Sequence, residues 1–258
     1  MYAAEDSTIT EGTELVLVRH GETVWNTQGR IQGTGDSPLT ENGVAQAEAL
    51  AWRLHRSGRC PITACYASPL GRAHHTAQIL TSNGLALPVT LEPDLAERNY
   101  GVLEGLSPEE KLARFPEVVA EDEAGGEDYA PPGGESRAMV RTRALRALAK
   151  IASRHPGERI LIVTHGAVLG IVARSVWGIP RANTGAFSVP NTALNLFRWR
   201  NKRWQITAWG DTGEFCVGSG HGYWVVDVAA ALRLIGVGVM LGAVASLGAA
   251  GLLVRRRR

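Results

Sequence analysis

Apolar and β-branched residues gather in short runs along this chain, separated by polar or glycine-rich stretches. Runs of this length and composition are typical of buried β-strands. The last two runs are close enough in sequence to be joined by a tight turn. The strands that we expect cover residues 14–18, 62–67, 88–91, 159–165, 193–199 and 203–209.

Between these runs, apolar residues recur every three or four positions, which is the pattern of helices that bury one face. Thr40 can cap a helix that carries Val44, Ala47, Leu50, Ala51 and Leu54 on that face. Ser136 can cap a longer helix that stops at 155–157, and we expect further helices over 70–82 and from 166 to 176. This alternation predicts a three-layer α/β/α sandwich with a mostly parallel sheet.

Length and composition limit the classes of protein to consider. A chain of 258 residues can bury one sizeable core with an appendage. The net charge of +2 excludes a basic footprint for nucleic acid over the whole surface. The three cysteines lack CxxC spacing and suit a reducing compartment, and the histidines form no metal-binding pattern. We therefore expect neither a metal nor a cofactor.

Arg19, His20 and Gly21 form the most informative stretch of the sequence. They follow the first expected strand, at the carboxyl edge where α/β sheets bind ligands. The arginine fork suits a phosphate group, and the histidine can act as a nucleophile or a base. Gly21 allows a sharp turn and a close approach of the backbone to a ligand. The three residues predict a phosphate site with a reactive histidine.

Further motifs accompany this stretch in a fixed order. They are RHGETVWN (19–26), GRIQGTGDSPLTENGVAQA (29–47), ASPLGRAHHTA (67–77), LAERNYGVLEG (95–105), PGGES (132–136) and VTHGAVL (163–169). With these motifs the chain resembles the histidine phosphatase superfamily, also called the phosphoglycerate mutase-like family. The resemblance implies that 14–213 is a catalytic domain of phosphoglycerate mutase-like fold, preceded by a flexible tail at 1–13.

The resemblance also implies a role for each of five residues. His20 matches the nucleophile that forms a phosphohistidine. Arg19 and Arg72 match two guanidinium clamps on the phosphoryl group, and His165 matches a residue that contacts it and stabilises charge in the transition state. Glu97 matches the acid that protonates the leaving group and then activates water.

Some of these assignments leave alternatives open. Glu92 and Glu104 are close enough to Glu97 in sequence to be the catalytic carboxylate instead, although the ERNYG motif favours Glu97. The resemblance also implies a set of substrate-binding positions. These are Asn26, Gln32, Gly33, Tyr100 and Gly166.

The family contains both phosphatases and mutases, so the catalytic set does not decide the reaction. Mutases carry a long basic insertion after the ERNYG motif, whereas the segment 102–131 is short and acidic here. That charge disfavours a doubly phosphorylated cofactor. We expect a metal-independent phosphomonoesterase acting on a small phosphorylated metabolite. A cofactor-dependent phosphoglycerate mutase-type transfer is the second interpretation, and an inactive membrane-tethered scaffold is the third.

The C-terminus lies outside the resemblance. Residues 234–254 carry no charge and are long enough to span a bilayer, and four arginines follow at 255–258. We expect a linker at 214–233, then a C-terminal hydrophobic helix that anchors the protein in a membrane. The chain shows no secretory signal, so we expect the catalytic domain to lie in the cytosol. A homodimer is compatible with the sequence.

Overall fold

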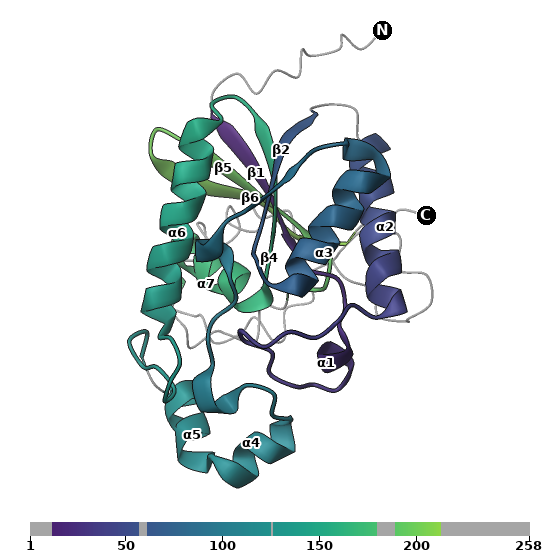
Figure 1. Cartoon of the computed structure of the whole chain (residues 1–258). Helices are drawn as coiled ribbons and strands as arrows, with labels where there is room; N and C mark the ends of the chain where they lie inside the picture. The colour runs from purple at the N-terminus through teal and green to yellow at the C-terminus, as the bar shows by residue number, and fades with distance from the viewer. Residues whose placement is uncertain (1–11, 57–60, 125, 180–188, 213–258) are drawn as a thin grey trace, which may run out of the picture.

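Six strands form a single sheet in the computed structural model, which describes residues 12–56, 61–124, 126–179 and 189–212. Figure 1 shows the sheet at the centre of the molecule, with helices around it. Each strand coincides within two residues with one that the apolar runs predict. The strands are β1 (Thr13–Arg19), β2 (Ile62–Ala67), β3 (Val89–Leu91), β4 (Arg159–Thr164), β5 (Leu194–Arg200) and β6 (Arg203–Asp211).

The strand order is β3-β2-β4-β1-β5-β6. The pairs among β3, β2, β4 and β1 are parallel, whereas β5 runs antiparallel to both β1 and β6. The sheet is therefore mixed: three of its five strand pairs are parallel, in line with the expected parallel part, and the two pairs that involve β5 are antiparallel. The cause is local: Asn201 and Lys202 both take positive φ, 51° and 58°, and this tight turn makes β5 and β6 a hairpin.

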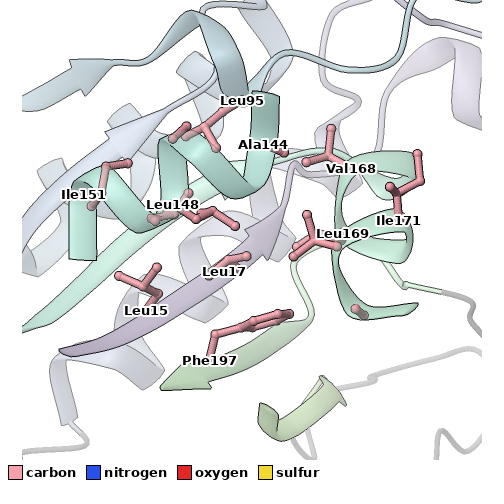
Figure 2. Packing of buried hydrophobic residues seen from close by; sticks show 14 of the residues in the cluster. Leu15, Leu17, Leu95, Ala144, Leu148, Ile151, Val168, Leu169, Ile171 and Phe197 are labelled. Atoms are coloured by element: carbon pink, nitrogen blue, oxygen red, sulfur yellow. The ribbon is translucent and has the colours of Figure 1, made fainter. Parts of the chain in front are cut away.

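Helices cover both faces of the sheet. Alternate residues of β1 point to opposite sides, so Leu17 packs with one core cluster and Val18 with the other. Figure 2 shows the first cluster, in which side chains of β1 and β5 meet two helices. The four covering helices are α6 (Arg137–Arg154) and α7 (Gly166–Trp177) on that face, with α2 (Glu41–Arg56) and α3 (Gly71–Leu80) on the other.

The two expected helix caps are confirmed. The backbone N–H of Gly43 donates to Oγ1 of Thr40 at 2.9 Å, and that of Met139 donates to Oγ of Ser136 at 3.2 Å. One expected helix ends early, because α3 gives way at Thr81 to a π-helical turn, η1 (Thr81–Leu85). The two caps define where α2 and α6 begin beside the sheet.

Smaller helices gather beyond one end of the sheet. α1 (Val24–Thr27) follows β1, and η2 (Pro93–Leu95) and η3 (Gly101–Leu103) surround the ERNYG motif. The short acidic segment that follows the ERNYG motif contains α4 (Pro108–Arg114) and α5 (Pro116–Ala124). These two helices form a separate lobe at the bottom of Figure 1, and we call residues 106–124 the cap.

Several expectations about the ends of the chain lie outside the described residues. Of the expected N-terminal tail, residues 12 and 13 are described. Thr13 already belongs to β1, where its Oγ1 donates to the carbonyl of Ala152 at 2.8 Å. The expected linker 214–233, hydrophobic helix 234–254 and basic end 255–258 are not described. Among the helices that are described, none has the length and apolar character needed to cross a bilayer.

Candidate active site

Two neighbouring parallel strands bring two histidines together. Arg19 ends β1 opposite Thr164 of β4, so His20 and His165 leave the sheet side by side. Their ring centroids lie 5.3 Å apart, and the backbone N–H of His20 donates to the carbonyl of Thr164 at 3.0 Å. Both side chains are buried. The carboxyl edge of the sheet therefore holds the two histidines that the sequence singles out.

The hydrogen bonds of His20 select one tautomer. Nδ1 lies 2.7 Å from the carbonyl oxygen of Gly21, which can only accept, so Nδ1 carries the proton. Nε2 accepts from Nε of Arg72 at 3.3 Å. Burial lowers the pKa of His20 well below its usual value, and the charges of Arg19 and Arg72 lower it further. The ring is therefore neutral, with the lone pair of Nε2 directed toward the arginine.

Arg72 stands in the first turn of α3 and is held mainly by backbone carbonyl groups. Nη1 donates to the carbonyl of Gly35 and Nη2 to that of Gly33, both at 2.8 Å. Nη1 also lies 3.5 Å from Oδ1 of Asp36. Burial lowers the pKa of Arg72, and the negative charges of Glu97 and Asp36 oppose that shift. The guanidinium is thus fixed beside His20 before any substrate binds.

Arg19 supplies the second cation. Its Nη1 donates to the carbonyl of Val189 at 2.7 Å. Its Nε is buried and finds no hydrogen-bond partner among the described residues. Burial lowers the pKa of Arg19, and the charge of Glu97 opposes this. A buried N–H donor without an acceptor is costly, so a ligand oxygen at this position would relieve the cost.

The tautomer of His165 depends on Ser68, a residue that does not line the cavity. Its Nε2 lies 2.7 Å from Oγ of Ser68, and that oxygen already accepts from the backbone N–H of Leu70 at 3.3 Å. If the hydroxyl proton of Ser68 goes to Nε2, then Nδ1 of His165 is the protonated nitrogen. This Nδ1 is buried and has no partner among the described residues. Burial and the charge of Arg72 lower the pKa of His165, which keeps the ring neutral.

Glu97 is buried, with 9% of its surface exposed, and faces the start of α7. Its Oε2 accepts from the backbone N–H of Ala167 at 3.2 Å, and its Oε1 accepts from that of Arg98 at 2.9 Å. The other two candidate carboxylates are engaged elsewhere. Glu92 accepts from the backbone N–H of Asp94, and Glu104 accepts from those of residues 34 and 100. Of the three, Glu97 is the one that lines the cavity described next.

A cavity of about 500 Å³ opens at this end of the sheet. His165 is the one expected site residue that does not line it; it lies behind, against His20. The cap contributes to the outer wall. The nine expected residues that line the cavity are Arg19, His20, Asn26, Gln32, Gly33, Arg72, Glu97, Tyr100 and Gly166.

The expected substrate-binding residues differ in whether their polar atoms already have hydrogen-bond partners. Oε1 of Gln32 is buried without a partner among the described residues, whereas Oδ1 of Asn26 is occupied by the backbone N–H of Thr23 at 3.1 Å. Gly33 takes a φ of +54°, which turns its carbonyl toward Arg72. Burial and the charge of Glu97 raise the pKa of Tyr100 to about 12, so its hydroxyl keeps its proton.

The outer wall carries charges of both signs. Arg30 and Lys111 line it together with two carboxylates, Asp122 and Glu123. Nζ of Lys111 lies 3.9 Å from Oε1 of Glu123. Asp122 anchors the cap, since its carboxylate receives Nη2 of Arg98 at 2.7 Å. The inner end of the cavity is thus cationic, and its outer wall has both charges.

The sequence interpretation missed residues that support the catalytic groups. Asn191 donates through Nδ2 to the carbonyl of His20 at 2.8 Å and also approaches Oδ1 of Asn26. Asn191 stands in no motif, and its only signal is its place in the turn before β5. Ser68 could have been found, because it belongs to the ASPLGR segment that also contains Arg72.

The residues that the structure describes contain no cluster of three or more His, Cys, Asp and Glu side chains arranged to hold a metal ion. The groups that converge on the cavity are cations, neutral imidazoles, a carboxyl group and a helix N-terminus. Cations and helix N-termini bind phosphate, and a neutral imidazole beside them can attack phosphorus. The arrangement can therefore support phosphoryl transfer by the side chains alone.

The known proteins that are similar to this chain include a phosphatase and a phosphoglycerate mutase-like protein. A metal-independent phosphoserine phosphatase of Arabidopsis thaliana is 40% identical over 206 residues, covering 80% of this chain and 84% of that protein. Phosphoglycerate mutase-like protein 4 of the same plant is 38% identical over 214 residues, covering 81% and 90%.

Among solved structures, a phosphoserine phosphatase variant of Entamoeba histolytica in complex with phosphoserine superposes with a TM-score of 0.68 at 28% identity, covering 79% of this chain and 99% of that one. The profile of the histidine phosphatase superfamily (branch 1) matches residues 15–212. This chain belongs to the histidine phosphatase superfamily.

Proposed function

We propose that this protein hydrolyses phosphomonoesters of small metabolites through a phosphohistidine on His20. The observation that carries the proposal is the state of His20: its Nε2 is unprotonated and lies 3.3 Å from the guanidinium of Arg72. A neutral nucleophile beside a fixed cation is what attack on a phosphate anion requires. The phosphatase relatives support hydrolysis.

In the first step, Nε2 of His20 attacks phosphorus and the bond from phosphorus to the ester oxygen breaks. Glu97, in its carboxyl form, gives its proton to the departing oxygen, so an alcohol leaves. Arg19, Arg72 and the backbone N–H of Gly166 at the start of α7 line the cavity where they would bind the three remaining phosphoryl oxygens. Nδ1 of His20 keeps its proton on the carbonyl of Gly21 throughout.

In the second step, Glu97 is a carboxylate and takes a proton from water. The water oxygen attacks phosphorus, and the bond from phosphorus to Nε2 of His20 breaks. Inorganic phosphate leaves, and both side chains return to their starting states. The step needs no metal ion or second substrate besides water.

A mutase-type transfer is the second candidate. The ERNYG motif and the mutase-like relative favour it. Against it, the segment that follows the ERNYG motif is short and acid-rich, and it places Asp122 and Glu123 on the outer wall of the cavity beside Arg30 and Lys111. Hydrolysis therefore ranks first.

The test incubates the full chain with p-nitrophenyl phosphate, with phosphoserine, and with 3-phosphoglycerate plus bisphosphoglycerate. We expect release of phosphate without isomerisation, and isomerisation without net release would favour the mutase. His20→Ala is expected to form no acid-labile phosphoenzyme. A normal amount of phosphoenzyme in that variant would refute His20 as the nucleophile, and inactivity of the wild type on every ester would support the inactive scaffold.

A further inference from the structure

Arg143 reaches from α6 to the segment that carries Glu97. The side chain is 15% exposed. Its Nη1 donates to the carbonyl of Asp94 at 2.8 Å and to that of Ala96 at 2.7 Å, and its Nη2 donates to that of Glu97 at 3.0 Å. One guanidinium thus binds three carbonyl groups within four consecutive residues.

Glu135 occupies the remaining donors of the same guanidinium. Nε and Nη2 of Arg143 each donate to one oxygen of Glu135, both at 2.9 Å. Arginine has five N–H donors, so all five of Arg143 are used. Glu135 in turn accepts from the backbone N–H of Asn99 at 3.1 Å, and its own backbone N–H donates to the carbonyl of Asn99 at 2.8 Å.

We propose that Arg143 is a positioning residue that holds the backbone on both sides of Glu97 and so sets the carboxyl group against the phosphate site. This inference rests on the proposed function. Arg143 does not line the cavity, and the groups it binds are backbone carbonyls and Glu135. Its contacts with the site therefore run through the backbone that carries Glu97, while its charge also contributes, after burial, to lowering the pKa of His165, an effect that Arg143→Lys retains. A lysine could keep the charge but not the planar fork that binds five acceptors at once.

Such a role predicts a specific kinetic signature. A displaced proton donor matters most when the leaving group is basic, and it matters least when the leaving group departs readily as an anion. Phenyl phosphate and p-nitrophenyl phosphate have similar size but differ in this property. Their kcat/KM values report the first chemical step, in which Glu97 supplies the proton.

The experiment compares these two esters for the wild type, Arg143→Lys and Arg143→Met. We expect kcat/KM on phenyl phosphate to fall at least about tenfold more than on p-nitrophenyl phosphate, because small misplacements of a catalytic group are costly. Arg146→Met is the matched control. It lies on the same helix and pairs with the side chain of Asp94, but it is 68% exposed and binds no carbonyl of the segment.

A double variant separates positioning from general structural damage. If Arg143 acts through Glu97, then adding Arg143→Lys to Glu97→Gln lowers kcat/KM by less than about twofold. Equal losses on both esters, or a full additional loss in the double variant, would overturn the inference. If Arg143→Met does not fold, Arg143→Lys and Glu135→Gln carry the same comparison. If the wild type is inactive on both esters, the proposed function fails and this inference fails with it. If the wild type is active, the kinetics of the variants alone decide the inference.

Discussion

The Nε–H of Arg72 donates to Nε2 of His20 across 3.3 Å, while carbonyl groups hold the rest of the guanidinium. The cation is therefore in place at the atom that would attack phosphorus. A lysine at this position would supply the charge without the fork that reaches His20 and two carbonyl groups together.

We expect Arg72→Lys to lower kcat/KM on p-nitrophenyl phosphate by at least about a hundredfold, the scale of losing a fixed donor to transition-state charge. Arg53→Lys is the matched control and should keep full activity. Arg53 lies on α2 and forms an ion pair with Asp211. Steady-state kinetics with circular dichroism as a folding check would measure both. Comparable activity of Arg72→Lys and the wild type would contradict the assigned role.

Ser68 is expected to matter without touching the substrate. Its hydroxyl lies 2.7 Å from Nε2 of His165, so Ser68→Ala frees Nε2 of the ring and removes the hydrogen bond that would favour a proton on Nδ1. We expect kcat to fall about tenfold while KM changes little, because the effect falls on charge stabilisation. Ser68→Thr keeps the hydroxyl and should retain more activity than Ser68→Ala. The reverse order would contradict the tautomer argument.

Gly33 and Gly157 provide a paired test of the backbone near Arg72. Both have positive φ, +54° and +79°, so an alanine strains both positions alike. A Cβ on Gly33 would lie 1.9 Å from Oε1 of Glu104, whereas one on Gly157 would meet nothing within 4 Å. We expect Gly33→Ala to unfold at a lower temperature than Gly157→Ala and to lose activity that Gly157→Ala keeps. Equal thermal shifts with equal activity would contradict this reasoning.

The buried histidines predict how stability depends on pH. Burial lowers the pKa of His20 and His165 well below 6.5, so below that pH the unfolded chain binds more protons than the folded one. The contribution to the free energy of unfolding is therefore full above about pH 6.5 and is lost as pH falls toward the folded pKa, by up to about 1.4 kcal/mol per pH unit for each histidine.

Urea unfolding at about pH 7.5 and about pH 5.5 would measure this difference. We expect the loss of stability on acidification to be smaller in His20→Asn than in the wild type. His75→Gln changes an exposed histidine on α3 and should leave the loss unchanged. An identical loss in His20→Asn and the wild type would show that His20 is not the source.

The sequence predicts the catalytic end of the fold better than it predicts the supporting contacts. Arg19 and His20 come at the end of an apolar, β-branched run that predicts a buried strand, so their place at a sheet edge could be predicted. The contact between Asn191 and the carbonyl of His20 spans 171 positions, and no local pattern announces it. Arg143 likewise looks like one of several arginines on α6 until its five partners are known.

The direction of β5 beside β1 was not predicted, for a related physical reason. Apolar runs report that a strand is buried but not which way it runs beside its neighbour. The hairpin turn at residues 201–202 decides that β6 pairs with β5, whereas the antiparallel pairing of β5 with β1 has no local signal in the sequence. Helices α4 and α5 of the cap bury few residues, so their sequence carries little of the periodic apolar pattern that announces a helix.

The cap has a consequence for how this protein can change over time. Arg19, Arg72 and Gly166 at the inner end of the cavity come from β1, α3 and α7, whereas Lys111 and Glu123 come from a contiguous stretch anchored through Asp122. Substitutions in that stretch can change which substrates fit the cavity while the residues at its inner end stay the same. Natural selection can therefore change the substrate of such a protein through substitutions in one short segment, without an inactive intermediate.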